Sequence, residues 1–187
     1  MSPFFCAMKN NPWQTKSKNK IFENPWIILE EHLVINPSGK DGIYGKVSFK
    51  NKALGIIPLD QEGYTWLVGQ YRYPLDEYSW EIPMGGGPIG KDILESAKRE
   101  LKEETGLLAN QWTKIMRIHT SNSVTDEEGF VFLAEGLTQG ETEFDETEVL
   151  KIIRLPLQEA VEKVMKGEIT DAISIAGLLK VARIKGI

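Results

Sequence analysis

The chain has 187 residues, enough to bury the core of one domain with a small appendage. Its formal net charge of −5 argues against a basic surface that binds nucleic acid broadly. Cys6 is the only cysteine, which excludes an internal disulfide and a thiolate zinc site. No segment has the pattern of a signal peptide or a membrane span, so we expect a cytoplasmic protein.

Three parts follow one another along the chain. Residues 1–20 are rich in Lys, Asn and Ser and are typical of a loosely held arm. Residues 21–53 are expected to form a small β-rich segment, and residues 54–187 the main domain. Short apolar runs between turn residues predict strands at 27–35, 43–50, 53–58, 64–71, 113–120, 128–134 and 149–155. Helical spacing predicts helices over 93–105, 157–166 and 171–184, the last with Thr170 as N-cap. Mixed strands with three helices in this order suit an α/β/α sandwich.

The first of these helices is marked at both ends. Asp92 is a good N-cap, and Glu95 follows three residues later, as in a capping box. Gly106 occupies the place of a left-handed C-cap residue. The preceding segment, Gly85–Gly90, is rich in glycine, so its backbone can approach a ligand closely. We therefore predict a glycine-rich loop followed by a helix.

Three carboxylates lie on one face of this helix. Glu100, Glu103 and Glu104 occupy positions i, i+3 and i+4. Such a cluster repels itself and is better tolerated around a divalent cation. Oxygen ligands without Cys or His favour Mg²⁺ or Mn²⁺ over Zn²⁺. Arg99 can pair with Glu103, four residues on. Taken alone, the three glutamates are equally well explained as a solvated acidic face.

The segment as a whole resembles the Nudix box of the Nudix hydrolases. That box runs Gly, five residues, Glu, seven residues, Arg-Glu-hydrophobic, one residue, Glu-Glu, one residue, Gly-hydrophobic. The residues that match in register are Gly85, Arg99, Glu100, Leu101, Glu103, Glu104, Gly106 and Leu107. Lys91 departs from the pattern, because the family has its first Glu there and uses it to organise the metal site.

The resemblance implies a fold and a metal site. The fold is the Nudix α/β/α sandwich with a mixed sheet, here preceded by the small β-rich segment. Glu100, Glu104 and the backbone carbonyl of Met84 correspond to ligands of Mg²⁺, for which Mn²⁺ can substitute. Glu103 would support these ligands or share a metal. Gly85, Arg99 and Gly106 match positions of the box that have a structural role in the family.

Residues before the box resemble one subgroup of the family. Gln70-Tyr71-Arg72-Tyr73-Pro74 and Trp80-Glu81-Ile82-Pro83 are similar to the subgroup that cleaves ADP-ribose and other nucleoside diphosphate sugars. There, a β-rich segment like residues 24–53 often packs across a homodimer, so a homodimer is expected. The motif implies that Arg72 and Glu81 lie at the substrate, and a guanidinium matches phosphate bidentately. An ordinary surface charge is the alternative for Arg72.

Three tryptophans are candidates for stacking on the base of a nucleotide. Trp26, Trp66 and Trp80 are each better explained as core residues, although one of them can serve both purposes. Trp26 is taken as the candidate substrate contact.

Two polar loops complete the candidate site. In the subgroup, a loop placed like Phe144–Val149 carries the general base and a further metal ligand, which implies these roles for Glu146 and Glu148. The choice between the two stays open, and a merely polar loop is the alternative. Asn122 stands where ADP-ribose specialists often carry Pro, which predicts a broader preference for nucleoside diphosphate sugars. Asn122, Ser123 and Glu127 can contact the sugar, or simply cap the loop.

The predicted activity is Mg²⁺-dependent hydrolysis of the diphosphate linkage of a nucleoside diphosphate sugar. The products would be a nucleoside monophosphate and a sugar phosphate. Two alternatives remain open at this point. One is a Nudix hydrolase of triphosphates, dinucleoside polyphosphates or capped RNA, and the other is a non-catalytic module that binds a nucleotide sugar.

Overall fold

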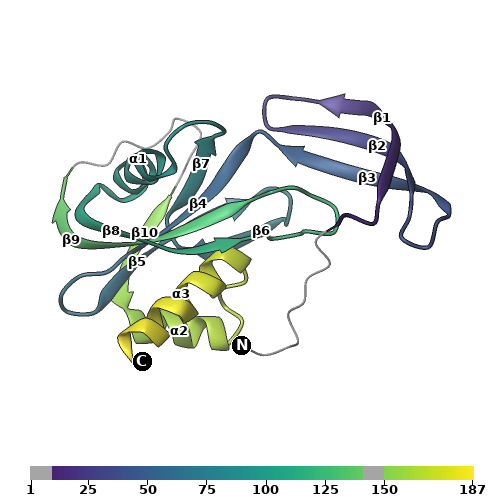
Figure 1. Cartoon of the computed structure of the whole chain (residues 1–187). Helices are drawn as coiled ribbons and strands as arrows, with labels where there is room; N and C mark the ends of the chain where they lie inside the picture. The colour runs from purple at the N-terminus through teal and green to yellow at the C-terminus, as the bar shows by residue number, and fades with distance from the viewer. Residues whose placement is uncertain (1–9, 141–149) are drawn as a thin grey trace. The chain divides into compact units, whose positions relative to one another are not determined.

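The computed structural model describes residues 10–140 and 150–187, and the chain divides into two compact units (Figure 1). The N-terminal unit consists of the residues up to Lys50 together with 121–126, and the main unit of residues 51–120 and 127–187. The predicted boundary at 53/54 therefore falls three residues late. The prediction also missed that residues 121–126 join the N-terminal unit, where the Val47 N–H donates to the Val124 carbonyl at 2.9 Å.

The N-terminal unit is an antiparallel sheet of three strands in the order β1-β2-β3. Its strands are β1 (Gln14–Glu23), β2 (Ile27–Ile35) and β3 (Asp41–Phe49). The predicted arm over residues 1–20 is wrong from Gln14 onward, because this stretch pairs with β2. Every residue of β1 is exposed, so its polar composition gives no hydrophobic pattern. Lysine-rich sequence of this kind is common on edge strands, where it discourages pairing with another chain.

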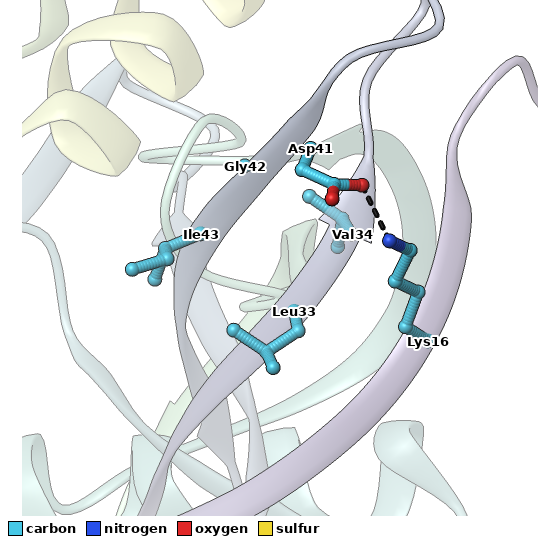
Figure 2. Close-up of a pocket in the computed structure, with 6 residues that line it drawn as sticks. All are labelled: Lys16, Leu33, Val34, Asp41, Gly42 and Ile43. Atoms are coloured by element: carbon cyan, nitrogen blue, oxygen red, sulfur yellow. Dashed lines mark hydrogen bonds and ion pairs between the residues drawn. The ribbon is translucent and has the colours of Figure 1, made fainter.

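One face of this sheet is apolar and hollowed (Figure 2). Leu33 pairs with Ile43 across β2 and β3, and the two side chains are 46% and 68% exposed. They line a pocket of about 520 Å³ together with Val34 and Gly42. Lys16 of β1 reaches across β2 to Asp41 of β3, and their charged groups lie 2.5 Å apart.

The main unit contains two sheets and three helices. One sheet has the order β10-β5-β6 and the other the order β7-β4-β9-β8. The pair β4–β9 is parallel and the remaining pairs are antiparallel, so the second sheet is mixed. The strands are β4 (Asn51–Pro58), β5 (Tyr64–Arg72), β6 (Glu77–Glu81), β7 (Met84–Pro88), β8 (Leu107–Ile118), β9 (Gly129–Gln139) and β10 (Lys151–Pro156). The helices are α1 (Ile93–Thr105), α2 (Leu157–Met165) and α3 (Ala172–Lys185).

Two hydrophobic clusters hold the helices on opposite faces of the sheets. Leu54 and Ile56 of β4 pack with Leu101 of α1 in one cluster. Ile57, on the other face of β4, packs with residues of α2 and α3 such as Leu178 in the second. Figure 1 shows α1 on one side of the main unit and α2 and α3 on the other. The predicted α/β/α sandwich with a mixed sheet is confirmed.

Two local predictions differ from the structure. Gly85–Gly90 was expected to be a loop, but Met84–Pro88 forms β7, which pairs with β4. Glycine weakens a strand on its own, so only the long-range pairing reveals it. The N-cap of α3 is Asp171 and not Thr170, because the Asp171 carboxylate accepts the Ser174 N–H at 2.7 Å. No helix among residues 10–140 and 150–187 combines the length and apolar composition needed to span a membrane.

Candidate active site

Helix α1 has the ends that the sequence predicted. The Asp92 carboxylate accepts the Leu94 N–H at 2.8 Å, and Gly106 has a left-handed φ of 71°. The capping box is not closed, because the Glu95 carboxylate pairs with Lys98 at 2.7 Å. With these ends, the helix turns Glu100 and Glu104 toward β7.

All three candidate carboxylates of α1 have defined partners. Glu104 is only 3% exposed and accepts the backbone N–H of Met84 at 2.9 Å. Arg99 lies between the other two: its guanidinium is 2.5 Å from Glu100 and also pairs with Glu103. The predicted Arg99–Glu103 contact is therefore present. The arrangement draws the acidic face of α1 against the strand that precedes it.

Gly85 is required by the close approach of Glu100. A Cβ atom at this position would lie 2.1 Å from the carboxyl carbon of Glu100, so no side chain fits there while Glu100 keeps its place. Burial raises the pKa of Glu100, and the nearby charge of Glu103 acts in the same direction, whereas Arg99 opposes the shift. A buried carboxylate of this kind is stabilised by an additional cation.

Arg72 and Glu81 form the second charged feature. The Arg72 Nε donates to one oxygen of Glu81 at 3.0 Å, and a terminal nitrogen pairs with the other oxygen. Glu81 is 4% exposed, so this bidentate contact fixes the plane of the guanidinium. Glu81 raises the pKa of Arg72, and the charges of Asp171 and Glu104 add to that effect.

A pocket of about 250 Å³ joins these two features. Arg72 and Glu104 line it together, so the predicted phosphate contact and a predicted metal ligand face one space. Its full lining is Ala53, Leu54, Gln70, Arg72, Met84, Gly85, Glu104 and Ile173. Gln70 and Ile173 were not predicted as site residues, because the motif Gln70–Pro74 gives Gln70 no role and Ile173 has the pattern of an ordinary core residue.

Three predicted substrate contacts lie in the N-terminal unit. Trp26 is 65% exposed, so its assignment to a core is wrong. Its backbone N–H donates to the side-chain oxygen of Asn24 at 2.9 Å. Asn122 and Ser123 belong to the segment that pairs with β3, and the Ser123 carbonyl accepts the Tyr44 hydroxyl at 2.5 Å. Contact of these three residues with substrate stays a prediction.

The other two tryptophans behave as the sequence suggested. Trp66 packs against the cluster on the α1 side, and Trp80 packs against the cluster on the side of α2 and α3. Both are partly buried in the main unit.

The predicted base and metal ligand, Glu146 and Glu148, fall outside the described residues. Gly140 and Lys151, which flank the residues 141–149, contact elements that carry predicted site residues. Gly140 donates its N–H to the Gly106 carbonyl, at the C-terminal end of α1, at 2.7 Å. Lys151 pairs with Gly69 of β5, the strand that carries Arg72. The roles of Glu146 and Glu148 stay predictions.

The charges of the site suit a divalent cation. Five carboxylates, those of Glu81, Glu100, Glu103, Glu104 and Asp171, surround only two guanidiniums, an excess of three negative charges. The donors are hard oxygens, which Mg²⁺ prefers. Within residues 10–140 and 150–187, no three His, Cys, Asp or Glu side chains are arranged to hold a metal ion by themselves. The donor atoms and the excess negative charge therefore fit a hard divalent cation.

A glycine strand packed against the carboxylate face of α1, within an α/β/α sandwich, is the arrangement of a Nudix domain. The chain belongs to the Nudix family, whose NUDIX domain matches residues 50–175. It is 35% identical over 167 residues to an ADP-ribose pyrophosphatase of Bacillus subtilis (strain 168), covering 88% of this chain and 90% of that protein. It is 36% identical over 178 residues to an ADP-ribose pyrophosphatase of Mycobacterium tuberculosis, and this match covers 93% of this chain and 85% of that protein. The fold matches a crystal structure of an ADP compounds hydrolase with a TM-score of 0.84 at 21% identity, over 96% of this chain and 98% of that one.

Proposed function

We propose that the protein hydrolyses the diphosphate linkage of ADP-ribose and similar nucleoside diphosphate sugars to a nucleoside monophosphate and a sugar phosphate. The observation that carries this proposal is the single pocket lined by both Arg72 and Glu104. It presents a phosphate-binding group and a carboxylate of the Nudix box to the same ligand. The two ADP-ribose pyrophosphatases that share about a third of their residues with this chain support the same substrate class.

The metal of the proposed site is Mg²⁺, with Mn²⁺ as a substitute. Glu100, Glu104 and the Met84 carbonyl would hold it, and Glu103 would support them. When bound, Mg²⁺ offsets phosphate charge and lowers the pKa of a bound water. Arg99 orients two of the carboxylates before the metal arrives.

The remaining chemistry belongs to side chains. Arg72 donates to a phosphate oxygen, and Glu81 holds the guanidinium in the orientation that this contact requires. Glu146 or Glu148 takes the proton of the attacking water as the general base.

Replacement of Glu104 by Gln tests the metal assignment. The change removes a ligand charge but keeps the size of the side chain, so kcat should fall roughly 10²–10⁴-fold. Glu95→Gln is the matched control, because Glu95 lies on the same helix and contacts Lys98. Release of AMP from ADP-ribose in a Mg²⁺ titration measures both. Retention of more than half of wild-type turnover by the Glu104 variant at saturating Mg²⁺ would show that the metal assignment is wrong.

The substrate range needs a panel assay. The wild-type protein is incubated with ADP-ribose, other nucleotide sugars, nucleoside triphosphates, dinucleoside polyphosphates and capped RNA. Preference for the nucleotide sugars is expected, and preference for any other class would replace the proposed function. A protein that binds a nucleotide sugar but releases no monophosphate would be a non-catalytic module. The cytoplasmic location expected from the sequence is tested by cell fractionation.

The proposal includes a homodimer that packs through the N-terminal unit. Leu33 and Ile43, which pair across β2 and β3, are 46% and 68% exposed, and Phe22 on the same sheet face is 51% exposed. Exposed apolar side chains gathered on one face are typical of interaction sites. A three-stranded sheet also gains stability when such a face is covered. We expect wild-type protein to be dimeric by light scattering at micromolar concentration and Ile43→Asp to be monomeric. Met165→Asp, at an apolar residue 74% exposed on α2, is the control and should stay dimeric. A monomeric wild type with full activity would contradict this part of the proposal.

A further inference from the structure

A second pocket, of about 270 Å³, shares Arg72 with the pocket of the candidate active site. It is formed by the turn after β5, the strand β6 and the start of α3. Its lining is Arg72, Pro74, Leu75, Ser79, Glu81, Thr170 and Asp171. A ligand group attached to a phosphate at Arg72 can therefore extend into this second space.

The lining selects for an uncharged polyol. Glu81 already matches the charge of Arg72, so Asp171 leaves the pocket with a net negative charge that disfavours a second phosphate. None of the described residues that line it is aromatic, so it offers no platform on which a base can stack. Ser79 and Thr170 supply hydroxyl groups. Sugar hydroxyls donate to carboxylates in charge-assisted hydrogen bonds, while Pro74 and Leu75 suit the apolar face of a sugar ring.

Each of the two carboxylates of this pocket has a fixed partner, which is Arg72 for Glu81 and the start of α3 for Asp171. Asp171 accepts the Ser174 N–H at 2.7 Å as the N-cap of α3. The hydroxyl of Ser174, which is fully buried, accepts the Ile82 N–H at 3.0 Å, and Ile82 follows Glu81 in the chain. An ionised carboxylate can accept further hydrogen bonds beyond the one that caps the helix. Groups fixed in this way lose little conformational entropy when a ligand binds.

We propose that this pocket binds the non-nucleotide sugar of the substrate, through hydrogen bonds from its hydroxyl groups to Asp171, Thr170 and Ser79. Arg72, in the wall common to both pockets, then binds the phosphate that carries this sugar. The inference rests on the proposed function and adds the residues that select the sugar. The volume is near the lower end of ligand sites, which suits one sugar ring.

Two substrates that differ only in the sugar provide the test. ADP-ribose is compared with the methyl ester of ADP, which keeps the adenosine and the diphosphate but has a methyl group in place of the ribose. The measured quantity is the ratio of kcat/KM for ADP-ribose to kcat/KM for the methyl ester. This ratio cancels any general loss of activity that a variant suffers.

The variants are Asp171→Asn and Thr170→Val, with Thr113→Val on β8 as the control. Asn is as good an N-cap as Asp, so the first change removes the charge and keeps the helix start. Thr170 and Thr113 are both exposed, so their replacement by Val leaves the core intact. We expect the ratio to fall about tenfold in the Asp171 variant and about threefold in the Thr170 variant, since each loses part of a hydrogen bond to a sugar hydroxyl. The control should keep the wild-type ratio within twofold.

The possible failures are distinguishable. An unchanged ratio in both pocket variants overturns the sugar site, whether or not their activity on the two substrates falls together. An equal fall in the control overturns it as well. If the wild-type protein hydrolyses neither compound, the proposed function itself is wrong, and the sugar site is withdrawn with it.

Discussion

Replacement of Gly85 by Ala should disable the site while leaving the fold in place. The added Cβ would lie 2.1 Å from the carboxyl carbon of Glu100 and 2.3 Å and 2.5 Å from its two oxygens. Unstrained contacts between such atoms begin at about 3.5 Å. The carboxylate must therefore retreat by more than about 1 Å, which breaks its contact with Arg99.

That displacement sets the size of the expected effect. Metal–oxygen distances tolerate deviations of only about 0.2 Å, and a misplacement of about 1 Å can cost 10²-fold in rate. We expect kcat/KM to fall about 10²-fold or more, which corresponds to about 2.7 kcal/mol of transition-state stabilisation. The effect on folding should be small, because the obstructing atoms end a flexible side chain and the Arg99 side chain is half exposed. The lower backbone entropy of Ala in the unfolded chain offsets part of the cost.

The assay is a Mg²⁺ titration of ADP-ribose hydrolysis, with thermal melting of the same samples. Gly86→Ala is the control, because its Cβ would meet only the Asn51 side chain, at 3.3 Å. We expect a higher Mg²⁺ concentration at half-maximal rate for the Gly85 variant, and rates within threefold of wild type for the control. A Gly85 variant that melts like wild type, keeps its rate within threefold and has an unmoved Mg²⁺ titration would refute the reasoning.

Three further changes test separate parts of the structure. Lys91→Glu should lower the Mg²⁺ concentration needed for half-maximal rate and change kcat less than tenfold, because a lysine at the start of this helix is disfavoured by the helix dipole and repels a cation bound by the nearby carboxylates. A raised KM with an unmoved Mg²⁺ titration would instead place Lys91 at the substrate phosphate. Lys52 and Arg117 lower the pKa of Glu128 to about 2, so Glu128 stabilises the fold above its ordinary pKa of 4.5 and loses this effect as the pH falls toward 2. The melting temperature of Glu128→Gln should therefore approach that of wild type between pH 5 and pH 3, and a constant gap would contradict the assignment. Gly55→Ala would place a Cβ 2.8–2.9 Å from two buried isoleucine side chains, which should cost about 1–3 kcal/mol and lower the melting temperature by about 3–10 °C.

The parts of the fold that local sequence determines were predictable. Strand β2 has the predicted bounds, Ile27–Ile35, because turn residues lie on each side of it. Helix α1 begins and ends as predicted because Asp92 and Gly106 act on their own neighbours. The pairing of Arg99 with Glu103 follows from helical spacing alone.

The parts that depend on pairing between strands were not predictable. Strand β7 consists mainly of glycine and exists because β4 pairs with it. Strand β1 is polar from Gln14 to Lys20, apolar only at Ile21 and Phe22, and is held by its backbone pairing with β2. The bidentate contact between Arg72 and Glu81 joins two adjacent strands, so the motif suggested both residues but not their partnership.

Under the proposed function, the matched charges of Arg72 and Arg99 account for a dependence of this site on a cation. Arg72 is neutralised by Glu81, and Arg99 is shared between Glu100 and Glu103. Each guanidinium offers hydrogen bonds in a fixed direction, but neither contributes unmatched positive charge to an incoming diphosphate. Glu104, in the same pocket as Arg72, adds repulsion. In the proposed mechanism the side chains would orient the diphosphate, while divalent cations would supply the charge that attracts it. This division explains why an arginine site with an excess of carboxylates can still serve an anionic substrate.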